Sequence, residues 1–176
     1  NIQVFAGGTT ASDTVIGEDA GQTWSITGDD IFTATGSFSF TNFENITGGT
    51  GIDTVNVSNG GSLSGTYDGG STGSNSIVYS ATYGSAVDVN LTAGTATGFG
   101  GVANIHAVTG DETYTATNSY TATGAAHTWT LSANDYGTDG TNTFTHFGNV
   151  TGGALDDTFT FGDGVEMSGT VSGGSA

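Results

Sequence analysis

FENITGGTGIDTVNVSNGGSLSGTYDG, Phe43–Gly69, has a matching stretch further along the chain. The second stretch is FGNVTGGALDDTFTFGDGVEMSGTVSG, Phe147–Gly173, about 104 positions later, and the two align without insertion or deletion. Internal repetition at a fixed period is typical of repeat architectures. We therefore expect tandem units of about 104 residues, with the first at 1–103 and part of a second at 104–176.

Apolar and polar residues alternate in several short segments of the chain, which is the pattern of a strand with one buried face. These segments are SFSFTNF (37–43), DTVNV (53–57), AVDVNL (86–91), TFTHF (143–147) and DTFTF (157–161). Gly-Gly, Asn-Gly and Asp-Gly pairs between them supply tight turns, and the absence of Pro suits strands that are paired on both sides. The sequence predicts an all-β fold. A long tandem unit favours a parallel β-solenoid, of β-helix or β-roll type, running continuously through both units.

The charge of the chain is one-sided. Its 176 residues include no Lys or Arg and 17 Asp or Glu, which gives a formal net charge of −17. Nucleic acids and anionic membrane surfaces both attract basic residues, so neither is an expected partner. No apolar run is long enough to cross a bilayer, so membrane insertion is not expected. Each carboxylate must be solvated, hydrogen-bonded or neutralised by a cation, and Ca²⁺ is the natural choice.

The best-defined motif is GGTGIDTVN, Gly48–Asn56. Three stretches depart from it: GGALDDTFT at 152–160, GGTTASDTV at 7–15 and GGSTGSNSI at 69–77. The motif resembles the haemolysin-type calcium repeat (RTX), in which a glycine-rich turn and an Asp carboxylate bind calcium.

This resemblance implies a Ca²⁺ cofactor. The implied ligands are Asp53, Asp157, Asp156 and Asp13. The same residues have a second interpretation, because Asp and Asn commonly cap tight turns through hydrogen bonds to nearby backbone. Both interpretations stay open at the level of the sequence.

Over almost its full length, the chain is similar to the Gly- and Asp-rich tandem repeats of large bacterial surface proteins and adhesins. The phrases that carry the similarity are FENITGGTGIDT (43–54) and VDVNLTAGTATG (87–98). The resemblance implies an extracellular or cell-surface location, and the absence of Cys is compatible with secretion. We expect a non-enzymatic structural protein, stabilised by calcium, that self-assembles into fibres or a surface or matrix layer. The alternative is a rigid stalk of an adhesin, with glycan or cell-surface contacts.

Self-association is expected because the chain lacks the Lys and Pro residues that usually protect exposed strand edges. An enzyme is not expected. Asp29-Asp30 and Asp156-Asp157 are candidate carboxylate pairs for a carbohydrate-active β-helix, which is the remote alternative. Lyases and hydrolases of that kind use a basic residue to abstract a proton, or Arg or Lys to hold a uronate, and this chain has no Lys or Arg.

Overall fold

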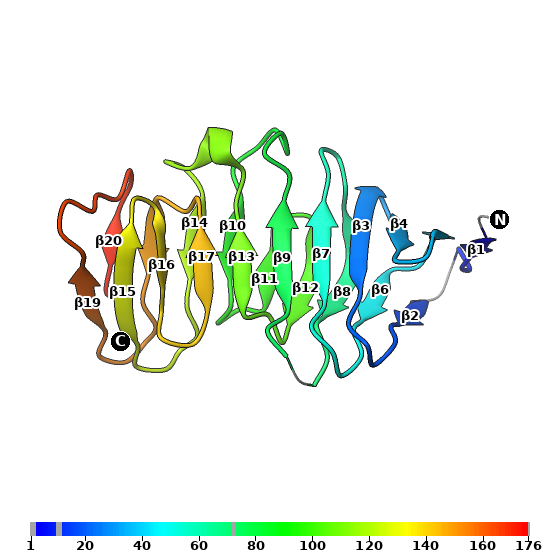
Figure 1. Cartoon of the computed structure of the whole chain (residues 1–176), viewed down its shortest axis with the longest axis horizontal. Coiled ribbons are helices and arrows are strands. Elements are labelled where there is room, and N and C mark those ends of the chain that lie inside the picture. The colour runs from blue at the N-terminus through cyan, green and yellow to red at the C-terminus, as the bar shows by residue number, and fades with distance from the viewer. Residues whose placement is uncertain (1–2, 10–11, 72, 176) are drawn as a thin grey trace.

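The computed structural model describes residues 3–9, 12–71 and 73–175, and it is built from short strands (Figure 1). The longest sheet has eleven strands. In spatial order these are β1 (Gln3–Ala6), β5 (Phe38–Thr41), β4 (Ile31–Ala34), β3 (Thr23–Gly28), β7 (Thr54–Val57), β9 (Ser76–Tyr79), β13 (Ala107–Thr109), β17 (Thr143–Thr145), β16 (Tyr136–Thr138), β15 (Thr128–Ala133) and β19 (Thr158–Phe161).

Two shorter sheets complete the fold. The four-stranded sheet has the order β12 (Phe99–Ala103), β8 (Leu63–Asp68), β6 (Asn45–Thr47) and β2 (Thr14–Ile16). The five-stranded sheet has the order β11 (Thr95–Ala96), β10 (Asp88–Asn90), β14 (Ser119–Thr121), β18 (Asn149–Thr151) and β20 (Val171–Ser172). One 3₁₀ turn, η1, covers Glu112–Tyr114. Among the described residues, no helix is long and apolar enough to cross a membrane.

The predicted all-β fold is confirmed. Each of the five alternating segments contains a strand, namely β5, β7, β10, β17 and β19 in chain order. In β7 the alternation is complete, since Val55 and Val57 are buried while Thr54 and Asn56, which alternate with them, are half-buried. Period-two alternation therefore located these strands correctly, because one face of each sheet packs on the core.

The prediction of a parallel β-solenoid built from tandem repeats of about 104 residues is wrong. The long sheet mixes parallel and antiparallel pairs. β3, β4 and β5 form a three-stranded antiparallel meander, which we call the first hairpin, and β15, β16 and β17 form another, which we call the second hairpin. In the five-stranded sheet, β11 is antiparallel to β10. The sheets also do not divide into units of about 104 residues, since the long sheet takes strands from the whole chain.

Short connections cause the reversals. Only Asp29 and Asp30 separate β3 from β4, and two residues likewise separate β15 from β16. Such a connection joins antiparallel neighbours, whereas parallel neighbours need a longer crossover. Asp30 and Asp135 have φ of 50° and 55°, and Gly36 between β4 and β5 has φ of 91°. These left-handed conformations allow tight turns.

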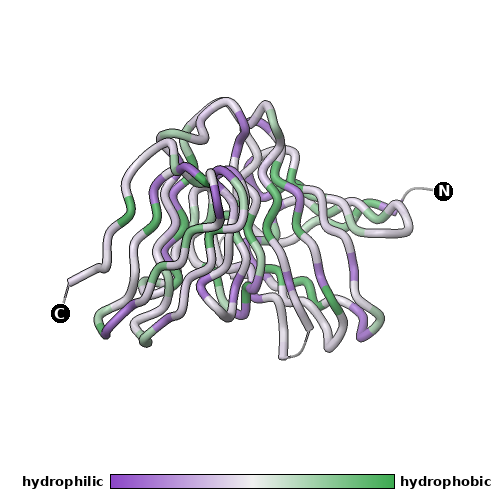
Figure 2. The backbone as a smooth tube through the Cα atoms, turned by 60° about the vertical axis from the view of Figure 1, so that its left-hand side comes forward, coloured by the Kyte–Doolittle hydropathy of each residue, from purple (hydrophilic) through white to green (hydrophobic). Residues whose placement is uncertain are grey.

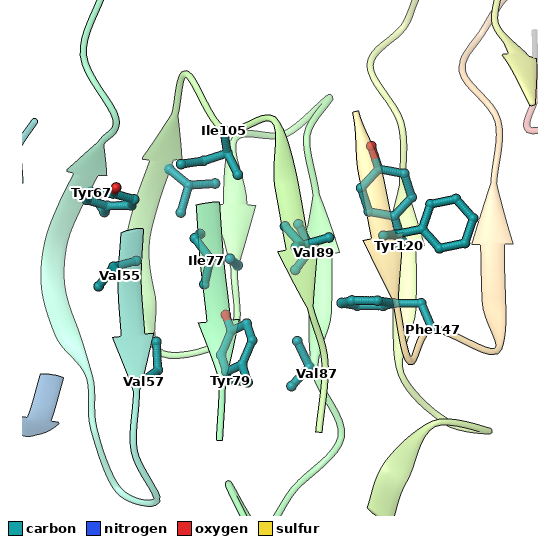
Figure 3. Packing of buried hydrophobic residues seen from close by; sticks show 14 of the residues in the cluster. Val55, Val57, Tyr67, Ile77, Tyr79, Val87, Val89, Ile105, Tyr120 and Phe147 are labelled. Carbon is teal, nitrogen blue, oxygen red and sulfur yellow. The ribbon is translucent and has the colours of Figure 1, made fainter. Parts of the chain in front are cut away.

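The core lies between the long sheet and the two shorter sheets (Figure 3). Val55 and Ile77 come from the long sheet, Tyr67 from the four-stranded sheet, and Val89 and Tyr120 from the five-stranded sheet. All five side chains are fully buried. The apolar interior is thus a narrow layer that extends with the number of strands.

The two ends of this layered stack leave strand edges open. β1 and β2 lie at one end of the long axis, and β19 and β20 lie at the other (Figure 1). Each of the four ends its sheet, and within the described ranges no further strand pairs with its outer edge. Next to the N-terminus the chain projects sideways beyond the stacked strands (Figure 2). The stack has open edges at both ends.

Candidate functional site

In all four glycine motifs, the first glycine lies against the side chain of the Asp or Asn that precedes the next strand. We call this pair a Gly–Asx unit. The four units are Gly7 with Asp13, Gly48 with Asp53, Gly69 with Asn75, and Gly152 with Asp157. A Cβ placed on Gly48 would lie only 2.5 Å from Asp53 Oδ2, so the close approach requires glycine.

Three of the Gly–Asx units join the start of one strand to the start of its neighbour in the long sheet. The backbone N–H of Gln22 donates to Asp53 Oδ1 at 2.8 Å, and the backbone N–H of Asp53 donates to Asn75 Oδ1 at 2.8 Å. The backbone N–H of His127 donates to Asp157 Oδ1 at 3.0 Å. These bonds satisfy N–H groups that lie just outside the strand ladders.

The unit at Asp13 is different. Asp13 Oδ2 accepts from the backbone N–H of Gly8, five residues earlier in its own loop. The backbone N–H of Asp13 donates in turn to Glu44 Oε2 at 2.7 Å. The Asp13 carboxylate therefore accepts a hydrogen bond within its own loop, whereas the side-chain oxygens of the other three units accept from backbone N–H groups in more distant parts of the chain.

Asp53 is the most buried of the predicted calcium ligands. It is 0% exposed, and its Oδ2 has no hydrogen-bond partner among the described residues. Burial raises the pKa of this carboxyl above its usual value, although hydrogen bonds from the backbone of Gln22 and Gly49 act in the opposite direction. Ionisation of Asp53 therefore lowers the stability of the folded state relative to its protonated form.

The structure does not bring the predicted ligands together. Asp53 and Asp157 precede β7 and β19, which five other strands separate in the long sheet. Asp156 is exposed beside Asp157, and Asp13 belongs to the four-stranded sheet at the far end. Across residues 3–9, 12–71 and 73–175, no three His, Cys, Asp or Glu side chains are grouped to hold a metal ion. Calcium binding at these residues stays a prediction.

The other candidate carboxylate pair, Asp29-Asp30, contacts a neighbouring strand. Ser62 Oγ donates to Asp29 Oδ1 at 2.8 Å. The backbone N–H and the hydroxyl of Ser64 donate to the two oxygens of Asp30, each at 2.7 Å. These carboxylates hold the β3–β4 turn against the start of β8.

A buried polar cluster was not foreseen from the sequence. It consists of Tyr120, Thr123, His127, Asp139 and Asn142. The Tyr120 hydroxyl donates to Asp139 Oδ2 at 2.7 Å, and Asn142 Nδ2 donates to the same oxygen at 3.0 Å. Asp139 Oδ1 accepts from the N–H of Asn142 at 2.6 Å. Burial, and then the Asp139 carboxylate, raise the pKa of Tyr120 well above its usual range, so the hydroxyl remains a donor.

Within this cluster, the His127 ring lies between Asp139 and Thr123. Its Nδ1 lies 3.1 Å from the backbone oxygen of Asp139, and its Nε2 lies 3.0 Å from Thr123 Oγ1. The ring therefore connects the loop before β15 with the turn after β16. In the sequence, Asp139-Gly140 is an ordinary turn pair, and only its position beside Tyr120 in the fold makes the carboxylate a core residue.

At the N-terminal end an open apolar groove of about 620 Å³ lies between the first hairpin and β2. We call it the N-terminal groove. Its apolar lining is Phe5, Val15, Ile16, Trp24, Ala34, Phe38 and Phe40. Ile16 is 74% exposed and Phe5 is 42% exposed. Large apolar side chains are rarely left this exposed in contiguous groups unless a partner covers them.

The C-terminal end also exposes apolar side chains. Phe161 on β19 is 47% exposed and Leu155 in the loop before it is 60% exposed. Phe159 on the same strand is half-buried and stacks on Trp129, with ring centroids 5.0 Å apart. We call β19 and β20 together the C-terminal edge.

Comparison of the chain with protein-family models, with curated proteins and with solved structures found no match.

Proposed function

We propose that this chain is a non-enzymatic structural protein of the cell surface or extracellular space that self-assembles into fibres or a layer. The observation that carries the proposal is the pair of open ends. Both ends of the stack present unpaired strand edges next to exposed apolar side chains. Unprotected edges are templates for pairing with another chain, and no Lys or Pro in the sequence blocks them.

The carboxylates of the chain support a structural role. Asp29, Asp30, Asp53, Asp139 and Asp157 all accept hydrogen bonds from groups that belong to turns and strand starts. They tie neighbouring parts of the chain together, and this use of acidic residues is that of a scaffold. With no Lys or Arg present to hold an anionic substrate, we propose no catalytic activity.

Calcium belongs to the proposal as a promoter of assembly. Two copies that approach each other each carry a formal charge of −17. Divalent cations screen such repulsion more effectively than monovalent ions at equal concentration, because they raise the ionic strength further. They also stabilise the assembled form if they bind it preferentially.

The test is negative-stain microscopy and light scattering of the purified chain in three buffers: with calcium, with a chelator, and with NaCl at the ionic strength of the calcium buffer. Circular dichroism reports whether β structure survives in each. We expect fibres or sheets in calcium and fewer in chelator. If assembly is equal in calcium and NaCl, screening alone explains the effect and calcium is not a ligand. Particles that stay monomeric in every buffer would contradict the proposed function and favour a discrete stalk.

A further inference from the structure

The inside of the molecule shows how an end like the N-terminal one is covered. Beside the second hairpin, Tyr120 on β14 packs on Trp129 with ring centroids 5.9 Å apart, and it is 0% exposed. Beside the first hairpin, the corresponding residue is Val15 in the middle of β2, which pairs with Ile46 as Tyr120 pairs with Val150. Val15 lines the N-terminal groove with Trp24 and is only half-buried. The two strands occupy similar positions relative to their hairpins, but the central residue is fully buried in β14 and only half-buried in β2.

The difference comes from the next strands along. β14 has β10 as its outer neighbour, and β13, which flanks the second hairpin, has β9. Both of these pairs are parallel. At the first hairpin the flanking strand is β1, and neither β1 nor β2 has an outer neighbour among the residues described. By analogy with β9 and β10, a partner that covered β1 and β2 would supply two strands, one pairing in parallel with each.

The C-terminal edge offers such a pair. β19 ends the long sheet and β20 ends the five-stranded sheet, so together they present one strand from each layer. β19 is also oriented correctly. β1 is parallel to β5, and β5 is parallel to β3 because both are antiparallel to β4. β3, β7, β9, β13 and β17 are parallel in succession, and β15 and β19 share their direction because β16 reverses it twice.

We propose that copies of this chain associate head to tail, with β19 and β20 of one copy pairing in parallel with β1 and β2 of the next. This rests on the proposed function and identifies the partner surface as a second copy. A head-to-tail contact is heterologous, so it leaves a free end on each new copy and generates filaments unless it closes into a ring.

Backbone and side-chain groups at the two ends suit this contact. The backbone N–H of Gly17 donates to the carbonyl of Thr47 on the neighbouring strand β6. Because the N–H groups of successive residues in a strand point to opposite sides, the N–H of Ile16 points to the open side of β2. Gly162 donates to Leu131, so the N–H of Phe161 points to the open side of β19. Ile16 and Phe161 therefore combine an exposed apolar side chain with an unpaired edge donor, one at each end.

Two single substitutions block the ends separately. Ile16→Glu places a charge on the N-terminal end, and Phe161→Glu places one on the C-terminal edge. Each variant keeps one intact end. We expect each variant alone to need at least about tenfold higher concentration to associate, which corresponds to a loss of about 1.4 kcal/mol in the contact. The matched control is Ile52→Glu, because Ile52 is 63% exposed in the loop between β6 and β7 and lines neither the N-terminal groove nor the C-terminal edge.

The decisive measurement is an equimolar mixture of Ile16→Glu and Phe161→Glu, analysed by size-exclusion chromatography with light scattering. The intact C-terminal edge of the first variant can pair with the intact N-terminal end of the second. We expect the mixture to form one-to-one dimers and nothing longer, while each variant alone stays monomeric. Dimers also show that both variants are folded, and circular dichroism of each alone checks this independently.

Other outcomes overturn the inference in different ways. If the unmodified chain associates and Phe161→Glu alone still does so, the copies meet through their N-terminal ends or their sides, and the head-to-tail contact is wrong while self-assembly stands. The same holds if both folded variants are monomeric alone and in the mixture. If the unmodified chain itself never associates, the proposed function fails and the inference fails with it.

Discussion

The two hairpins of the long sheet have the same strand order but different surroundings. In the first, β3–β5, Trp24 packs edge-on against Phe32 and both are buried, but Phe40 is only half-buried and one side of the hairpin opens into the N-terminal groove. In the second, β15–β17, Trp129 contacts Tyr120 and Phe144, and all three rings are 0% exposed. The comparison shows that the hairpin by itself does not determine how well it is buried. Strands contributed by distant parts of the chain decide that.

The polar groups beside the two tryptophans differ in the same way. Trp129 Nε1 donates to Asp157 Oδ1 at 3.2 Å. Trp24 Nε1 is buried without a hydrogen-bond partner, although Asp53 occupies the corresponding Gly–Asx unit. The second hairpin is thus completed by hydrogen bonds as well as by packing, and the first is not.

The largest difference between the hairpins is expected from the buried polar cluster. Asp139→Ala removes the acceptor of Tyr120 and Asn142 and leaves their donors buried, which costs roughly 3 to 5 kcal/mol. For a domain of this size, that lowers Tm by on the order of 10 °C. Thermal unfolding followed by circular dichroism measures it. The matched change in the first hairpin is Thr35→Ala, at an exposed residue whose hydroxyl accepts from the N–H of Thr23. An equal loss from both changes would show that the cluster adds nothing.

A medium effect is expected from the two tryptophans. Trp24→Phe and Trp129→Phe remove the same volume, so their packing costs are similar. Trp129→Phe also removes the hydrogen bond to Asp157, and it should therefore cost about 1 kcal/mol more in unfolding free energy than Trp24→Phe. Urea unfolding of both variants below the concentration of self-association gives the difference. A larger loss from Trp24→Phe would mean that the first hairpin is the better packed of the two.

The smallest effect is a pH dependence at Asp53. Because its folded pKa is raised above 3.8, Asp53 contributes most to stability below that pH, and the contribution is lost as the pH rises through the folded pKa. Asp53→Asn removes this loss and keeps an oxygen acceptor for the N–H of Gln22. The Tm of the variant relative to the unmodified chain should therefore rise between pH 4.5 and pH 7.5. Asp163→Asn, at an exposed residue, is the control, and a similar change there would refute the role of burial.

The sequence predicted the strands well because their signal is local. Alternation in DTVNV and DTFTF follows directly from the two faces of a strand, and β7 and β19 lie where it indicates. The all-parallel arrangement was predicted wrongly, because β4, β16 and β11 run antiparallel to their neighbours. Whether a turn such as Asp29-Asp30 reverses the chain within a sheet or turns it toward another sheet depends on the conformation of two residues, and many residue types permit either.

The site residues show the same limit. The glycine motifs singled out Asp53 and Asp157, and in the structure each lies against the first glycine of its unit. Their oxygens were expected to bind calcium or cap turns, and the structure shows them accepting hydrogen bonds from the backbone N–H groups of Gln22 and His127, each just before a neighbouring strand. Those partners are about thirty residues away in the sequence. The burial of Asp139 depends likewise on Tyr120, which only the fold brings near.

The Gly–Asx unit has a consequence for how such a chain can change over evolution. Its bond to the neighbouring strand needs an oxygen acceptor and no charge: Asn75 and Asp53 perform the same task one strand apart, and both are fully buried. Exchange of Asp for Asn at such a position keeps the acceptor and removes a negative charge. Single Asp-to-Asn substitutions can therefore change the net charge of the molecule while its strand pairing is retained.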